Sequence, residues 1–337
     1  MIFGDIGGDQ TEAPSLGSAL NLSWSEKART IWVEGPTTWW TSNIYSLGPS
    51  FRQLLNLPRW IPLDFMSDHG VTFGRNFFVC EIMRRRTFPS TYLSWFGGQV
   101  AHASSRLGGD LPVEVVGCPH PWTAANRHYE SAGLSQDGCL AFVPHSVIGG
   151  VPDMGPIYTW KEFWKELPKA LQPTALCLSI HELKLETLAA LRQLDLPLFT
   201  VGNPNSAFFM HRFYNLRRRF KFSISPVFGS EACYISDLGW DHFLFGEWNT
   251  GGSRGPGVDN WQDKFRQLAK EEPDVDLDLW EEADSVFREI SPNISSRFQM
   301  SDHLLGKHFR RNLGLIRERV SHVTPNGWWR SRQRFCR

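Results

Sequence analysis

The stretch from Phe222 to Gly246 constrains the fold more than any other part of this 337-residue chain. A short apolar run, Phe222–Ser225, ends in a turn rich in Pro and Gly, and a helical pattern then runs from Ser230 to Gly239. A second apolar run follows at residues 243–245. Strand, turn, helix and strand in this order form the unit from which parallel sheets are built. The stretch therefore predicts an α/β fold with a parallel sheet.

Apolar runs and helical patterns alternate in the same way along much of the chain. The runs predict strands at residues 30–35, 113–117, 139–143, 174–180 and 197–202, and helices at residues 50–55, 91–107, 160–167, 185–194 and 206–220. Within residues 60–71 they predict a strand-like segment that leads into a loop at residues 68–70. A segment rich in Gly and Pro, residues 149–156, separates two such halves. We therefore expect two Rossmann-like domains facing a cleft, at residues 1–148 and 149–258. Residues 259–337 form a C-terminal extension, first acidic and then basic and helical.

Composition and charge exclude several classes of protein. The formal net charge is +0, which gives no electrostatic basis for binding nucleic acid. No apolar stretch approaches the roughly 20 residues needed to cross a bilayer, and the first residues do not resemble a signal peptide. Six cysteines without a CxxC pair suit a reducing, cytoplasmic setting. The basic tail suggests either peripheral contact with an anionic membrane or glycan, or pairing with the acidic segment.

The start of the helix after Ser225 is a candidate anion site. Gly229, Ser230 and Glu231 open this helix, where free backbone N–H groups and the helix dipole favour a phosphate. Hydroxyl groups, including that of Ser225, add further donors without any lysine. The alternative is an ordinary turn between a strand and a helix. Dinucleotide, P-loop and zinc-protease motifs are all missing, which leaves those reaction classes without support.

Two further groups of polar residues follow predicted strands. Asp68 and His69 precede Gly70 in a loop, where a carboxylate beside an imidazole could supply a general base. His145 and Ser146 follow the strand at residues 139–143 and could reach a phosphate, although a surface histidine explains them equally well. His120 stands between two prolines, and we interpret it as a conformational residue.

Several short motifs together resemble the bacterial GT-B glycosyltransferases of surface-polysaccharide biosynthesis. They are Phe-Val-Pro-His-Ser at 142–146, a strand ending in His at 179–181, Thr-Val-Gly-Asn at 200–203, Arg-Phe-Tyr at 212–214, and a Ser/Gly-rich pattern at 223–239. The resemblance implies that a sugar moves from a nucleotide-sugar donor to a hydroxyl of a glycan or lipid-linked glycan. It also implies that the donor contacts His181, Asn203 and Arg212, besides His145, Ser146 and the helix start.

The same resemblance implies that no metal or other cofactor is needed, because the nucleotide-sugar is itself a substrate. Asp68 or His69 would deprotonate the acceptor in an inverting reaction, and Asp68 would act as nucleophile or stabiliser in a retaining one. Two other functions stay open at this point. One is a nucleotide-sugar epimerase on the same fold, and the other is a non-catalytic, glycan-binding assembly subunit.

Overall fold

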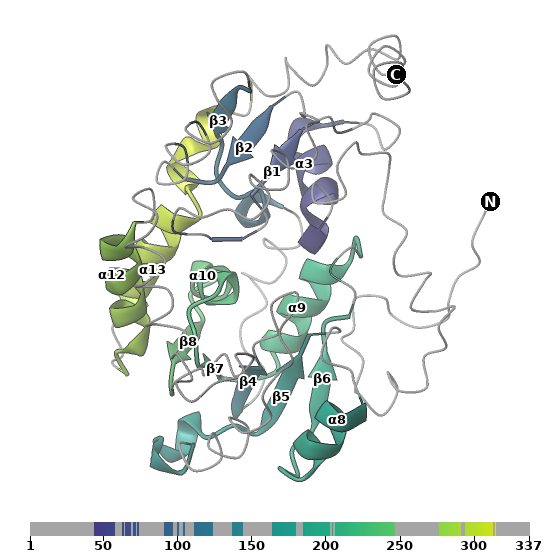
Figure 1. Ribbon diagram of the computed structural model, residues 1–337, viewed down its shortest axis with the longest axis vertical. Helices are drawn as coiled ribbons and strands as arrows, with labels where there is room; N and C mark the ends of the chain where they lie inside the picture. The colour runs from purple at the N-terminus through teal and green to yellow at the C-terminus, as the bar shows by residue number, and fades with distance from the viewer. Residues whose placement is uncertain are drawn as a thin grey trace, which may run out of the picture.

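The described part of the chain has an α/β fold with two parallel sheets, one of three strands and one of five (Figure 1). The computed structural model describes residues 44–57, 63, 65–68, 70–71, 73, 91–96, 100, 104, 111–123, 137–143, 164–179, 185–202, 204, 206–246, 276–290, 294–312 and 314. The smaller sheet contains β1 (Met66–Ser67), β2 (Tyr92–Ser94) and β3 (Val113–Val115) in that order. The predicted α/β class with parallel pairing is therefore confirmed.

The larger sheet has the strand order β6-β5-β4-β7-β8. Its strands are β4 (Cys139–Val143), β5 (Ala175–Leu178), β6 (Leu198–Thr200), β7 (Phe222–Ser225) and β8 (Asp241–Leu244). All four pairings are parallel, with Leu140 opposite Ser223 where β4 meets β7. The chain winds outward from β4 to β6 and then returns to the other side of β4. Counted in chain order this is 3-2-1-4-5, an order found in doubly wound parallel sheets, and the winding reverses between β4 and β7.

Strand β4 belongs to a different half from the one expected. Residues 139–143 precede the predicted boundary at 149, whereas β4 lies in the middle of the five-stranded sheet. The change from one sheet to the other therefore falls between β3 and β4. Glycine and proline content marks where elements end, but it carries no information about which sheet a strand joins.

Helices cover both faces of the five-stranded sheet, because its strands bury side chains alternately on the two sides. Cys139, Ala141 and Val143 join a cluster with leucines of α8 (Leu185–Arg192). Leu140, between them, faces the other side, where α9 (Phe209–Arg217) and α10 (Ser230–Asp237) pack. Burial on both faces explains why these strands read as nearly continuous apolar runs.

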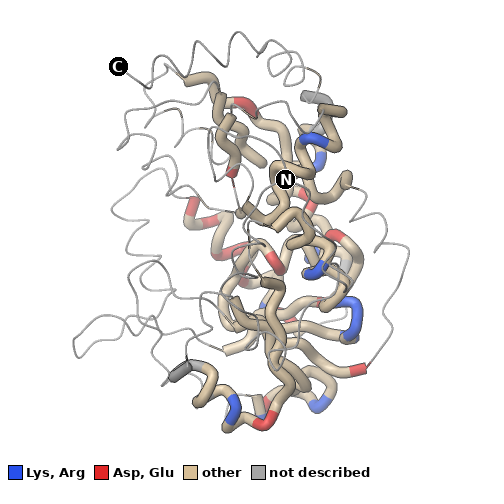
Figure 2. The backbone as a smooth tube through the Cα atoms, turned by 90° about the vertical axis from the view of Figure 1, so that its right-hand side faces the viewer, with Lys and Arg blue, Asp and Glu red and all other residues tan. Residues whose placement is uncertain are grey.

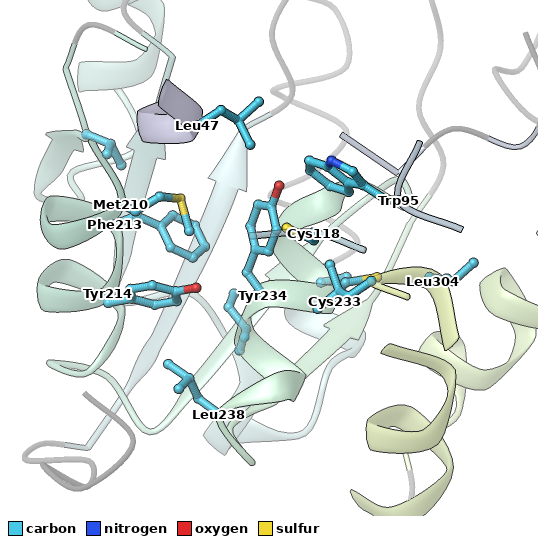
Figure 3. Packing of buried hydrophobic residues seen from close by; sticks show 14 of the residues in the cluster. Leu47, Trp95, Cys118, Met210, Phe213, Tyr214, Cys233, Tyr234, Leu238 and Leu304 are labelled. Carbon is cyan, nitrogen blue, oxygen red and sulfur yellow. The ribbon is translucent and has the colours of Figure 1, made fainter. Parts of the chain in front are cut away.

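A second hydrophobic cluster joins the two sheets through α10. Tyr234 of α10 lies between aromatic and apolar side chains of α9 and the ring of Trp95, which follows β2 (Figure 3). The helices α3 (Leu47–Leu55), α12 (Leu277–Arg288) and α13 (Ile294–Leu304) also contribute to this cluster. Full burial of each large side chain contributes about 1.5–3 kcal/mol, so this shared core holds both sheets and the C-terminal helices together.

Short 3₁₀ helices also occur in the described residues, among them η3 (His120–Trp122), η4 (Lys169–Leu171) and η6 (Lys307–Asn312). The acidic segment supplies the start of α12, where the Asp276 carboxylate accepts a hydrogen bond of 3.0 Å from the Leu279 backbone N–H. Basic and acidic residues are interspersed along the described backbone (Figure 2). Within the described parts of the chain, no helix is long and apolar enough to span a bilayer.

The helix predicted at residues 91–107 is wrong at its beginning. Residues 92–94 form β2, the central strand of the smaller sheet, and residues 100 and 104 are helical. Tyr92, Leu93 and Ser94 are all buried, so the strand lacks the alternation of polar and apolar residues that distinguishes a strand from a helix. A fully buried strand of this kind is typical of parallel sheets.

Candidate functional site

The best candidate site lies at the carboxyl ends of β4 and β7. In open α/β sheets, ligands bind outside the carboxyl ends of the strands where the strand order reverses, and here that point is between β4 and β7. Ser225 ends β7, and the following turn leads to α10 through Gly229. The stretch singled out in the sequence therefore occupies the position where this fold class usually places a ligand.

Gly229 and Glu231 shape the beginning of α10. Gly229 precedes the helix in an extended conformation, with φ −139° and ψ 172°, and no side chain caps the helix. A Cβ atom on Gly229 would collide with the Glu231 carboxylate, so that carboxylate lies over the glycine. This position suits a negative charge, because it faces the positive end of the helix dipole. The helix start therefore already carries an anionic group of the protein itself.

The loop after β1 contacts this helix start directly. The Val71 backbone N–H donates a hydrogen bond of 2.8 Å to Ser230 Oγ. Gly70 is equally close, since a Cβ atom there would lie 2.7 Å from the same oxygen. The contact joins the smaller sheet to the larger one, and it brings together the predicted Asp68-His69-Gly70 loop and the predicted anion-binding turn.

Asp68 is a buried anchor of this loop. Its side chain is 0% exposed, and its carboxylate accepts hydrogen bonds from Tyr92 Oη at 2.5 Å, Ser94 Oγ at 3.1 Å and the Trp95 backbone N–H at 2.9 Å. These donors belong to β2 and the residue after it, so Asp68 fixes the end of β1 against β2. A direct role of Asp68 in proton transfer stays a prediction.

Ser225 is part of a buried polar network. His242 of β8 lies between two hydroxyl groups, with Nδ1 2.9 Å from Ser223 Oγ and Nε2 3.0 Å from Ser225 Oγ. Arg217, also fully buried, donates from Nε to Ser223 Oγ at 2.8 Å. Burial, followed by the charges of Arg217 and Arg297, lowers the pKa of His242. Ser225 also donates to the Val227 carbonyl at 2.9 Å, so its hydroxyl shapes the turn.

Arg212 belongs to α9, and its guanidinium lies at the end of β6, on the other side of the reversal. Its Nη1 is 3.4 Å from the Val201 carbonyl and rests against Gly202, whose φ of +86° also favours glycine. Only 8% of Arg212 is exposed, and burial lowers its pKa. Strands β5 and β4 separate β6 from β7, so the two strand ends lie roughly 14 Å apart at the usual strand spacing. The carboxyl edge of the five-stranded sheet thus has the Arg212 guanidinium at one end and the turn before α10 at the other.

Tyr45 and Ser46 join this edge without any signal in the sequence. Both residues have a left-handed backbone conformation, with φ of 54° and 60°. This conformation costs about 1–3 kcal/mol per non-glycine residue, and residues that adopt it cluster at functional sites. Ser46 Oγ donates to the Ser206 carbonyl at 3.1 Å and accepts from the Met210 N–H at 3.2 Å. The Tyr45 ring contacts that of Phe209, with centroids 5.0 Å apart. Burial, then the Glu231 charge, raises the pKa of Tyr45 to about 12.

Several predicted site residues lie outside the described part of the chain: His69, His145, Ser146, His181 and Asn203, as does most of the basic tail. His120 is described and completely buried, with Nδ1 3.2 Å from Ser50 Oγ, which agrees with its interpretation as a structural residue. The described side chains contain no cluster of three or more His, Cys, Asp or Glu that could hold a metal ion.

Comparisons with known proteins do not assign this chain to a family. No protein-family profile, curated protein or solved structure matches the chain.

Proposed function

We propose that the chain is a glycosyltransferase of the GT-B type, which moves a sugar from a nucleotide-sugar donor to a hydroxyl of a glycan or lipid-linked glycan. One observation carries the proposal. The turn at the reversal point of the Rossmann-type sheet contacts, through Ser230 and Val71, the loop after β1 that contains the Asp-His-Gly sequence. A donor site and an acceptor-side base need this kind of adjacency, because the reacting groups must meet.

The charges at the carboxyl edge of the five-stranded sheet suggest where each part of the donor would bind. Glu231 carries a carboxylate, which repels phosphate but accepts hydrogen bonds from ribose or sugar hydroxyls. Arg212 carries a fixed positive charge and a planar fork of donors that matches phosphate oxygens. We therefore assign the hydroxyl-rich part of the donor to Glu231 and the phosphates to Arg212.

The acceptor side depends on the pair Asp68 and His69. Three hydrogen bonds hold the Asp68 carboxylate inside the protein, so the neighbouring His69 is the better candidate for taking the proton of the acceptor hydroxyl. Arg212 would stabilise the negative charge that develops on the leaving phosphate. This scheme needs no metal ion, and the chemistry comes from the nucleotide-sugar itself.

A thermal-shift screen with CMP, UDP, GDP and dTDP tests the proposal. A nucleotide present at 100 times its dissociation constant should stabilise the fold by about 2.7 kcal/mol. Arg212→Gln should abolish this shift, whereas Arg218→Gln, a half-buried arginine beyond the end of the same helix, should retain it. Absence of a shift with all four nucleotides would contradict the proposal. Conversion of the donor sugar without any acceptor would instead support an epimerase.

A further inference from the structure

We propose that Arg288, at the end of α12, is a positioning residue for the turn between β7 and α10. This inference rests on the proposed function, because it assigns to the C-terminal extension a part in binding the donor. Arg288 lies outside the segments that resemble a glycosyltransferase, and neither its type nor its spacing marks it in the sequence.

The guanidinium of Arg288 joins two chain segments that leave neighbouring strands. Nη2 donates to the Pro226 carbonyl at 3.4 Å, at the first residue after β7, and Nη1 donates to the Gly246 carbonyl at 3.0 Å, just beyond β8. Because the guanidinium is planar and rigid, these two bonds fix the distance and orientation between the two segments.

Asp284 holds that guanidinium in place from within α12. Its carboxylate accepts from Arg288 Nε at 2.5 Å and from Nη2 at 3.1 Å, a two-pronged contact between residues one helical turn apart. The Asp284 side chain is 14% exposed and that of Arg288 is 28% exposed. The pair is therefore partly shielded from water, and its geometry is set before any ligand arrives.

A second contact from α12 supports the same turn. Phe287 is fully buried, and its ring meets that of Phe228 edge to face with centroids 5.3 Å apart. Phe228 in turn meets Phe73, which follows the Gly70 loop, at 5.5 Å. The Phe73 carbonyl accepts a hydrogen bond of 2.8 Å from Asp276 N at the beginning of α12. One helix thus touches both loops of the candidate site.

These contacts predict how an Arg288 variant should behave. Water can replace the guanidinium at the two carbonyls, because the side chain is partly exposed, so the fold should persist. The turn would lose the bonds that fix Pro226, and the groups at the start of α10 would no longer be held in one arrangement. Ligand affinity should therefore fall much more than stability does.

The test compares three variants by calorimetric titration with whichever of CMP, UDP, GDP and dTDP stabilises the wild-type chain most. Arg288→Gln should raise the dissociation constant about tenfold, the size of one well-placed hydrogen bond to a charged group. Arg288→Lys keeps the charge but cannot span both carbonyls and Asp284, so its dissociation constant should rise as well. Arg192→Gln, an exposed arginine in the last turn of α8, should bind as the wild type does.

Amide hydrogen exchange of residues 227–231 in the ligand-free protein supplies an independent readout, and this exchange should be faster in both Arg288 variants but not in Arg192→Gln. Unchanged affinity in both Arg288 variants, with a wild type that binds nucleotide, would overturn this inference and leave the proposed function standing. Full affinity in Arg288→Lys alone would also overturn it, because charge rather than geometry would then suffice. A wild type that binds none of the four nucleotides would overturn both proposals.

Discussion

Replacement of Gly70 by alanine tests the contact between the two sheets. The added methyl group would lie 2.7 Å from Ser230 Oγ, a separation shorter than any ordinary contact, so the loop or α10 must shift. Overpacking of this kind costs about 1–3 kcal/mol. Ser230→Ala removes the hydrogen bond from the Val71 N–H and should cost about 1 kcal/mol.

The two substitutions together should cost less than their sum. Without Ser230 Oγ, the next atom near the new methyl group is Ser230 Cβ at 3.9 Å, which is an ordinary van der Waals contact. The double variant should therefore be about as stable as Ser230→Ala alone, which gives a coupling of about 1–3 kcal/mol.

Urea unfolding followed by tryptophan fluorescence measures this coupling, since Trp95 and Trp240 are buried and report on the core. Gly314→Ala serves as the control, because a Cβ atom at that position has no neighbour within 4 Å. Effects of the Gly70 and Ser230 substitutions that add to within about 0.5 kcal/mol would refute the contact.

Two other predictions follow from buried titratable groups. Burial lowers the pKa of His120 to about 3, and it also lowers that of His242, so both imidazoles are neutral in the fold and must gain protons in acid. The free energy of unfolding should therefore be highest above pH 6.5 and should fall below that pH by about 1.4 kcal/mol per pH unit for each histidine. Urea unfolding at pH 7 and pH 5 measures this fall, which should be smaller in His120→Gln than in the wild type. An equal fall in both proteins would contradict the prediction. Burial likewise raises the pKa of four buried thiols, those of Cys118, Cys139, Cys177 and Cys233. Peptide mapping after iodoacetamide treatment at pH 8 should therefore find these thiols modified only in urea. Modification of these thiols in the native protein would contradict the described core.

Local signals in the sequence predicted the elements of the second half well. The predicted strand at Phe222–Ser225 coincides with β7, and α10 ends two residues before Gly239, because apolar runs and glycine stops act within a few residues. The sequence pattern did not predict β2, because a short strand buried on both faces carries no periodic pattern.

Long-range pairing could not be predicted in the same way. Nothing in residues 139–143 indicates that they lie between β5 and β7 at the centre of the sheet. The contact of Val71 with Ser230 and that of Arg288 with Pro226 join residues far apart in the chain, so local patterns do not encode them. The sequence identified the helix start and the Asp-His-Gly loop separately, and the structure places them in contact.

Hydrogen exchange with and without a nucleotide tests the central claim most directly. The claim is that a nucleotide-sugar binds where the turn after β7 meets the loop after β1. A nucleotide that stabilises the protein should slow amide exchange at residues 225–231 and at residues 68–71, with little change in α8 on the opposite face of the sheet. Protection confined to α8, or spread evenly over the chain, would contradict the assignment of the site.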